Sequence, residues 1–292
     1  MTQKYFCQID LNGEYDRSHE MTLQDLAVVQ DLVRTHSAIV LETEKVYLVK
    51  SRLEPLAKSE GFVSLTELIQ KLRQSPYGVL HKKVVEAMTT NETSFFRDLV
   101  PFEVLRKQLL PEIMARKATS KRLNMWCGAS SSGQEPYSVM FTILEHLPEL
   151  QNWVIQFIAT DISEEMLAKC RAGTYSQLEV KRGLPASLLT RYFVKKGMGW
   201  QIREDIRRRI DFKRMNLAGP WITFPSMDLV FLRNVMIYFD METKKQILGN
   251  IRKILNPNGY VLLGGSETTL NLDDKYERVD FSGTACYRVK KA

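Results

Sequence analysis

A run of small residues between an apolar strand and a helix is the part of this sequence best suited to chemistry. Residues 123–127 predict the strand, and Gly128, Ser130 and Gly133 follow it before a predicted helix over residues 135–147. Glycine and serine leave little side chain in the way, so the backbone of such a turn can approach a ligand closely. We therefore expect a small-molecule site at this turn.

An acidic residue follows the next predicted strand. Residues 155–159 are apolar, and Thr160 and Asp161 come directly after them. In a doubly wound sheet, an acid at the tip of the neighbouring strand is placed to bind ribose hydroxyls. The Gly128 turn and Asp161 together indicate a site for a nucleoside cofactor.

Three common motifs are absent from the turn. The dinucleotide fingerprint GxGxxG has Ser130 in place of its middle glycine, and the nucleophile motif GxSxG fails because residue 132 is serine. The Gly-Lys-Ser/Thr of a phosphate-binding loop is also missing. A nucleoside without a pyrophosphate remains, and S-adenosylmethionine fits that description. Taken alone, a plain tight turn in an α/β sheet explains the segment equally well.

Two other polar clusters lie beside apolar segments. Residues 91–98, Asn-Glu-Thr-Ser-Phe-Phe-Arg-Asp, suit a lid that packs its phenylalanines and points polar groups at a ligand. Helix capping by Thr93 or Ser94 is an equal alternative for this cluster. Arg233 and Asn234 follow a predicted strand over residues 228–232. Polar residues at the carboxyl end of a central strand lie beside a bound cofactor, so strand-end turn chemistry is the weaker explanation there.

The composition, with 44% hydrophobic and 26% charged residues, is typical of a globular protein. The 292 residues carry a net charge of +7, which favours acidic partners, and no apolar run is long enough to span a bilayer. Residues 1–15 lack the apolar core of a signal peptide, so we expect a cytoplasmic protein. No metal site or disulfide is expected, because the cysteines form no CxxC motif and the histidines show no metal-ligand spacing. The cysteines are Cys7, Cys127, Cys170 and Cys286, and the histidines are His19, His36, His81 and His146.

The elements that must position these residues fall into two parts. Residues 1–88 predict a helical domain, residues 89–100 a linker that forms the lid, and residues 101–292 an α/β domain with a mostly parallel sheet. The first predicted helix starts at residue 22 and includes residues 26–33, and the other predicted helices are 42–59, 64–74, 80–88, 102–116, 135–147, 163–172 and 241–255. The remaining predicted strands are 259–264, 276–279 and 285–289.

One segment breaks the alternation of helices and strands. Residues 191–203 contain two short β-like arms around Gly197-Met198-Gly199, and residues 209–212 could complete a small antiparallel insert over residues 191–212. The arms are basic. A solvated hairpin and a docking surface explain this segment equally well.

The motifs taken together resemble the CheR-type methyltransferases of bacterial chemotaxis. The resemblance rests on Asn-Glu-Thr-Ser-Phe-Phe-Arg, Gly-Gln-Glu-Pro-Tyr-Ser, Ala-Thr-Asp-Ile, Arg-Asn-Val-Met-Ile-Tyr-Phe and Leu-Leu-Gly-Gly-Ser-Glu, which occur in the family's order and spacing over residues 20–289. Ser132 and Gln134 depart mildly from the family's turn, and Glu135 is retained. The resemblance implies a Rossmann-like S-adenosylmethionine-dependent methyltransferase sheet with an all-helical N-terminal domain and a small antiparallel β insert.

The resemblance also implies a set of site residues. Arg97 and Tyr238 match the side chains that border the methyl group and orient the substrate, and Gly128 lies in the cofactor turn. Glu135 matches the acid of that turn and Asp161 the ribose-binding acid. The other implied contacts with S-adenosylmethionine are Asn91, Thr93 and Arg97 of the lid, Asn216 and Leu217 beside the adenine, and Arg233 and Asn234 near the methionine part.

The implied reaction is the methylation of glutamate side chains on chemoreceptors, which yields a methyl ester and S-adenosylhomocysteine. A glutamate with a pKa near about 4.3 is already ionised at neutral pH, so the reaction needs no general base. Catalysis then depends on alignment and desolvation of the carboxylate and the sulfonium, and Arg97 would position the carboxylate. Tyr238 would donate a hydrogen bond or shape the methyl channel.

The expected partners are the cytoplasmic methylation helices of chemoreceptors. In the family the second helix faces the receptor, which implies substrate contacts for Lys50 and Arg52. The short tip at Gly197-Met198-Gly199 predicts a protein that works without a tether to a receptor's C-terminal pentapeptide. We expect a monomer, without nucleic acid and without membrane insertion. A non-catalytic S-adenosylmethionine-binding signalling module and, with less support, a nucleic-acid methyltransferase are the alternatives.

Overall fold

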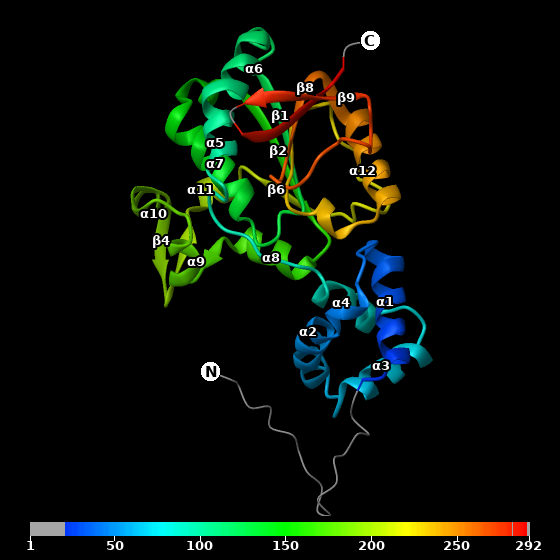
Figure 1. The fold of residues 1–292 in the computed structure, drawn as a ribbon. Coiled ribbons are helices and arrows are strands. Elements are labelled where there is room, and N and C mark those ends of the chain that lie inside the picture. The colour runs from blue at the N-terminus through cyan, green and yellow to red at the C-terminus, as the bar shows by residue number, and fades with distance from the viewer. Residues whose placement is uncertain (1–20, 282, 291–292) are drawn as a thin grey trace, which may run out of the picture. The chain divides into compact units, whose positions relative to one another are not determined.

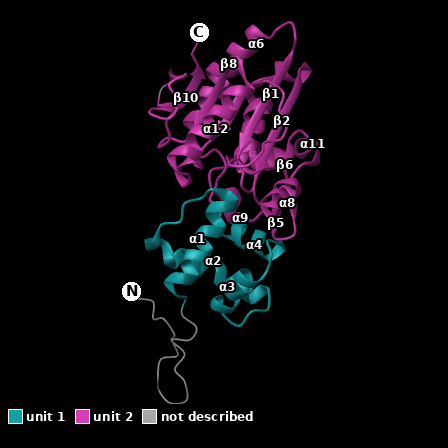
Figure 2. Ribbon diagram, turned by 90° about the vertical axis from the view of Figure 1, so that its right-hand side faces the viewer, with its two compact units in different colours: residues 1–89 teal, residues 90–292 magenta. Residues whose placement is uncertain are grey.

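A computed structural model describes residues 21–281 and 283–290, so residues 1–15, Cys7 and His19 lie outside the described part of the chain. The chain divides into two compact units between Thr89 and Thr90 (Figure 2). The first unit is helical and the second contains the sheets.

The helical unit contains α1 (Leu23–Ser37), η2 (Thr43–Lys45), α2 (Val46–Ser59), α3 (Leu65–Gln74) and α4 (Val79–Ala87). Its predicted helix starts are confirmed. The Thr22 hydroxyl accepts a hydrogen bond from the Asp25 N–H (3.1 Å), and the Asp25 carboxylate accepts one from the Thr22 N–H (3.0 Å). Ser64 caps α3 in the same way through the Glu67 N–H (3.1 Å). One apolar face of each helix packs into a common core around Val29, Leu53 and Leu68.

The second unit is built on a seven-stranded sheet with the strand order β6-β2-β1-β7-β8-β10-β9. The first five strands of that order are parallel, and β10 and β9 add to the edge in antiparallel orientation. Their bounds are β1 (Arg122–Gly128), β2 (Val154–Asp161), β6 (Asp211–Arg214), β7 (Met227–Leu232), β8 (Leu255–Leu263), β9 (Tyr276–Phe281) and β10 (Thr284–Val289). The predicted mostly parallel α/β sheet is confirmed.

Helices cover both faces of this sheet (Figure 1). The chain moves outward from β1 to β2 and β6 and then back across to β7 and β8, so right-handed crossovers place α7 and α12 on opposite faces. The helices are α5 (Val100–Val104), η3 (Leu105–Leu109), α6 (Leu110–Arg116), α7 (Gln134–His146), η4 (Pro148–Asn152), α8 (Glu164–Ala172), α9 (Gln177–Lys181), α10 (Ala186–Tyr192), α11 (Glu204–Arg207), η5 (Met236–Tyr238) and α12 (Met241–Ile254). No helix among the described residues is long and apolar enough to cross a membrane.

The small antiparallel sheet exists, but its third strand was predicted wrongly. It consists of β4 (Phe193–Lys196), β5 (Gly199–Ile202) and β3 (Thr174–Tyr175), with β5 in the middle. Residues 209–212 do not complete it, because β6 pairs in parallel with β2 at the edge of the large sheet. Phe212 is buried there against Tyr137 of α7, and this burial favours the large sheet for that strand.

Residues 102–116 form the predicted helix in three continuous pieces, α5, η3 and α6, of which η3 is a π-helical turn. The wide turn ends at Leu109, two residues before Pro111, whose missing N–H interrupts the regular hydrogen-bond ladder.

Candidate functional site

The turn between β1 and α7 is held in an unusual backbone conformation. Ala129 (φ 53°), Ser131 (φ 48°) and Gly133 (φ 95°) lie in the left-handed region. At Gly128 a Cβ atom would stand 2.7 Å from Leu232 Cδ1 and 2.9 Å from Trp126 Cζ2, so the end of β1 has no room for a side chain. The small residues of the turn are therefore required by its geometry.

Asp161, at the end of β2, fastens this turn. Its buried carboxylate accepts hydrogen bonds from the Ser131 N–H (2.7 Å) and the Ser163 N–H (2.9 Å). Ser163 in turn caps α8 through the Met166 N–H (3.3 Å). Each carboxylate oxygen has a second lone pair, so Asp161 can hold the turn and still accept a hydrogen bond from a ligand hydroxyl.

The lid residues pack against the same turn. The Asn91 carbonyl accepts a hydrogen bond from the Ser131 hydroxyl (2.8 Å), and the Phe96 N–H donates to the Ser138 hydroxyl of α7 (2.9 Å). Phe95 is buried among Phe141, Tyr175 and Phe193, as expected for a lid that packs its aromatic side chains.

The backbone of the lid then turns sharply, with Phe96 (φ 49°), Asp98 (φ 70°) and Leu99 (φ 46°) all left-handed. The half-buried Arg97 stands inside this turn and donates to the Glu92 carbonyl (3.1 Å). Thr93 is half-buried in the same segment. The conformation brings the Arg97 carbonyl and the Asp98 carboxylate to Arg233.

Arg233 connects the strand end, the turn helix and the lid. Its side chain is 2% exposed and forms an ion pair with Glu135 in the first turn of α7. Its second terminal nitrogen donates to Asp98 Oδ2 (2.7 Å) and to the Arg97 carbonyl (3.1 Å). Its Nε is buried and has no hydrogen-bond partner among the described residues.

The neighbouring Asn234 is held by a residue to which the sequence analysis gave no role. Asn234 has a left-handed backbone (φ 58°), and the N–H groups of Asn234, Val235 and Met236 donate to the buried carboxylate of Glu267 at 2.7–2.9 Å. The Gly264 N–H donates to the same carboxylate (2.7 Å). We call these four donors and Glu267 the carboxylate clamp. An acid four residues after the end of β8, in Gly-Gly-Ser-Glu, was the available signal.

Three further predicted residues lie at the same edge of the sheet. Asn216 and the buried Leu217 follow the end of β6, and the Met215 N–H donates to the Asp161 carbonyl (2.9 Å), so this segment starts beside the end of β2. The Asn216 side chain accepts from the Ala218 N–H (3.0 Å). Tyr238 ends η5, two residues beyond the clamped Met236, and is half-buried. The residues predicted to bind the cofactor therefore belong to strand ends of one sheet, to the lid or, for Glu135, to the first turn of α7.

The described cysteines are not activated thiols. Burial, together with the nearby Glu135 carboxylate, raises the pKa of Cys127 well above its ordinary value. Burial also raises the pKa of Cys170 and brings that of Cys286 to about 12. A thiolate nucleophile needs a lowered pKa, so these shifts indicate a packing role for Cys127.

The predicted substrate contacts Lys50 and Arg52 lie on α2 of the helical unit. The Arg52 guanidinium donates to the Met88 carbonyl (2.7 Å) and the Thr89 carbonyl (3.0 Å), which are acceptors at the C-terminal end of α4. Arg52 thus has a structural partner inside its own unit. Lys50 is half-buried.

The Arg52 hydrogen bonds to the end of α4 predict different effects on stability for substitutions at Arg52 and at Lys50. Arg52→Ala should lower the free energy of unfolding by about 1–2 kcal/mol, because two helix-end carbonyls lose a charged donor. Lys50→Ala should leave that free energy within about 0.5 kcal/mol of wild type, because surface substitutions away from such contacts have small effects. Urea unfolding followed by circular dichroism measures both, and equal stabilities of the two variants would contradict the assigned contact.

Comparisons with known proteins agree with this arrangement. A family model described as CheR methyltransferase, SAM binding domain, matches residues 91–284, and a model described as CheR methyltransferase, all-alpha domain, matches residues 24–89. Chemotaxis protein methyltransferase Cher2 of Pseudomonas putida is 44% identical over 257 residues, covering 86% of this chain and 93% of that protein. Chemotaxis protein methyltransferase 1 of Pseudomonas aeruginosa is 45% identical with the same coverage. The chemotaxis protein methyltransferase of Vibrio parahaemolyticus is 40% identical over 261 residues, covering 88% of this chain and 94% of that protein.

Proposed function

This chain belongs to the CheR methyltransferase family, a family of S-adenosylmethionine-dependent enzymes, and we propose that it methylates glutamate side chains on the cytoplasmic helices of chemoreceptors. The products are a glutamate methyl ester and S-adenosylhomocysteine. The observation that carries the proposal is the position of Arg233. This one buried side chain binds the helix after the cofactor turn and the lid together.

The residues of the site fit the cofactor in type and place. Asp161 would accept the ribose hydroxyls, Asn216 and Leu217 would lie along the adenine, and Arg233 and Asn234 would contact the methionine part. Gly128 and Glu135 of the turn and Asn91, Thr93 and Arg97 of the lid would complete the contacts. When bound, S-adenosylmethionine supplies an activated methyl group on a positively charged sulfur.

The chain's own residues then have to position the acceptor. A glutamate carboxylate is ionised at neutral pH and attacks without a base, so a guanidinium that aligns it is the group the reaction needs. Arg97 suits this role because its side chain is half-buried in the lid and donates to a backbone carbonyl without pairing with a buried acid. Tyr238, on the strand-end segment held by the carboxylate clamp, would border the methyl group. Lys50 and Arg52 would contact the receptor helices.

The direct test is transfer of labelled methyl from S-adenosylmethionine to membranes that carry chemoreceptors. We expect label that mild alkali releases as methanol, since methyl esters hydrolyse under conditions that N-methyl and nucleic-acid methyl groups survive. Cofactor binding without any transfer, tested over a panel of chemoreceptors, would contradict the proposal and favour the non-catalytic signalling module.

The role of Arg97 is tested by Arg97→Ala. We expect kcat/KM to fall about a hundredfold, because the acceptor carboxylate loses its charged partner and its alignment. Arg106→Ala is the matched control, since Arg106 is another half-buried arginine of the same unit and pairs with Glu103 outside the site. Methyl transfer by Arg97→Ala at the rate of that control would remove Arg97 from the proposed mechanism.

We also infer that the protein works without a pentapeptide tether. Strand addition would have to use the outer edge of β4, where Val194 is half exposed, and only Gly197 and Met198 separate β4 from β5. We expect a free pentapeptide from a receptor C-terminus to give no binding signal in calorimetry at about 100 µM, a concentration that detects micromolar complexes. Saturable one-to-one binding would overturn this inference.

A further inference from the structure

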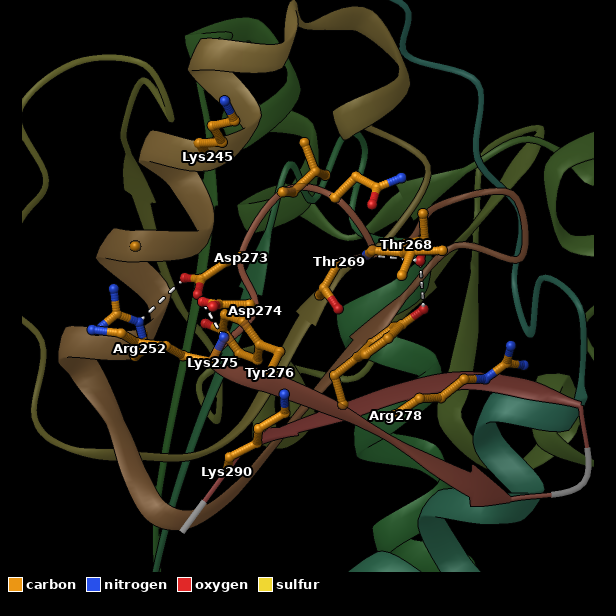
Figure 3. A pocket seen from close by; sticks show the side chains of 15 residues that line it. Lys245, Arg252, Thr268, Thr269, Asp273, Asp274, Lys275, Tyr276, Arg278 and Lys290 are labelled. Atoms are coloured by element: carbon orange, nitrogen blue, oxygen red, sulfur yellow. Dashed lines mark hydrogen bonds and ion pairs between the residues drawn. The ribbon is translucent and has the colours of Figure 1, made fainter. Parts of the chain in front are cut away.

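A hollow in the second unit lies away from all the residues assigned above. It has a volume of about 900 Å³ and opens between α12, residues 268–275 and strands β9 and β10 (Figure 3). None of the residues assigned to the cofactor or the acceptor lines it. Its size is that of a site for a small organic ligand.

The lining of this hollow is strongly basic. Five cationic side chains face two carboxylates, those of Asp273 and Asp274, and the cations are Lys245, Arg252, Lys275, Arg278 and Lys290. These lysines and arginines come from α12, from the loop before β9, from β9 itself and from the residue after β10, and they all line one concave surface. Charges of one sign around a concavity raise the local concentration of the opposite ion.

The carboxylate of Asp273 does not neutralise this positive charge. The Asp273 side chain is 10% exposed, and both of its oxygens already accept a hydrogen bond: Oδ2 from Arg252 Nε (3.2 Å) and Oδ1 from the Lys275 N–H (3.0 Å). The contact through Nε orients the guanidinium and leaves its two terminal nitrogens for a ligand. Figure 3 shows Arg252 beside Asp273, with Lys290 extending from the end of β10 below them.

Three of the cations have no acidic partner within the described part of the chain. No carboxylate there lies within ion-pair distance of Lys275, Arg278 or Lys290, whereas Lys245 pairs with Glu242 (2.9 Å). The Thr268 hydroxyl adds a neutral hydrogen-bond donor to the lining. The Thr268 hydroxyl accepts from Tyr287 (3.3 Å) and from the Leu270 N–H (3.1 Å), so its own proton is available to donate.

We propose that this hollow binds a small soluble anion that carries phosphate groups, with the size of a nucleotide. A guanidinium with two available nitrogens, several ammonium groups and a hydroxyl offer more donors than the two carboxylates of the lining can accept, and phosphate groups have the oxygens to use them. The site is independent of methyl transfer, so its occupancy can be measured whatever the activity of the enzyme.

The test uses tripolyphosphate and ATP as probes in titration calorimetry at physiological ionic strength. We expect one-to-one binding to the wild-type chain, and binding weakened about tenfold or more in the Lys275→Ala/Lys290→Ala variant, since each lysine supplies a charge-assisted contact. The matched control is Lys244→Ala/Lys253→Ala, which removes the same charge from α12 outside the hollow. It should bind within about twofold of wild type.

Several results would overturn the proposal. One is the absence of saturable binding to wild type up to about 1 mM probe, a limit that corresponds to very weak association. Another is equal weakening in both double variants, which would mean attraction by net charge alone. Cosedimentation with anionic lipid vesicles without any binding of the soluble probes would assign the surface to a membrane instead. Thermal unfolding of both variants, expected near the wild-type temperature, shows that the folds are comparable.

Discussion

The Glu267→Ala variant is expected to lose at least about 3 kcal/mol of the free energy of unfolding and nearly all methyl transfer. Glu267 accepts four backbone N–H groups at 2.7–2.9 Å in a buried setting. A buried donor left without a partner costs about 1–3 kcal/mol. The loss of activity follows because the clamped segment carries Arg233 and Asn234 at one end and Tyr238 at the other.

The Glu267→Gln variant separates the contribution of the carboxylate's charge from that of the side chain's size and shape. Glu267→Gln keeps the size of the side chain but turns one acceptor oxygen into an NH₂ donor that faces backbone N–H groups. We therefore expect kcat to fall, while the free energy of unfolding falls less than it does in Glu267→Ala. Glu277→Ala is the control, since Glu277 is an exposed acid paired with Arg288. Denaturant unfolding and methyl transfer give both quantities. A Glu267→Ala variant with the stability and kcat of Glu277→Ala would show that the clamp does not hold the site.

The second large effect is expected at Arg233. Arg233→Ala removes the ion pair with Glu135 and the contacts with Asp98 and the Arg97 carbonyl. Contacts with charged groups contribute about 1.5–3 kcal/mol each. We therefore expect the dissociation constant for S-adenosylmethionine to rise about a hundredfold or more, because the lid loses its attachment to the turn helix.

Lysine at position 233 tests the geometry of the attachment. An ammonium keeps the charge but lacks the planar fork that reaches Glu135 and Asp98 together, so Arg233→Lys should recover only part of the affinity. Arg203→Ala is the control, as its ion pair with Asp205 is exposed and contributes little. Calorimetry with S-adenosylmethionine and S-adenosylhomocysteine measures each variant. Wild-type affinity in Arg233→Ala would mean that the lid holds the cofactor without this side chain.

Local features of the fold could be predicted from the sequence. Thr22 and Ser64 start helices because their side chains satisfy backbone donors within three residues, an interaction that the local sequence alone determines. The turn after β1 could be predicted for a similar reason. Gly128 has no room for a Cβ atom and Gly133 has a left-handed backbone, so the geometry favours glycine at both positions.

The pairing partner of β6 could not be predicted in this way. Asp211–Arg214 has only Phe212 buried, and such a short strand suits a hairpin as well as the edge of a large sheet. The choice depends on the burial of Phe212 against Tyr137, more than seventy residues away in the sequence. Contacts of that range leave no local signal.

The roles of Glu267 and Arg52 escaped prediction for a related reason. An acid after a strand and an arginine on an amphipathic helix both look like solvent-exposed residues in the sequence. Their partners are backbone groups of other segments, the 234–236 turn for Glu267 and the end of α4 for Arg52. Backbone donors and acceptors have no residue type, so the sequence does not reveal where they lie.

The close fit of the carboxylate clamp has an evolutionary consequence. A Cβ atom at Gly264 would stand 2.8 Å from Asn234 N, Asn234 Nδ2 and Glu267 Oε2, so none of these positions can change size without a change at another. Residues 234, 264 and 267 should therefore vary together among homologous sequences. Chimaeras between relatives should stay active when the three residues come from one parent, and lose activity when a crossover separates Asn234 from the other two.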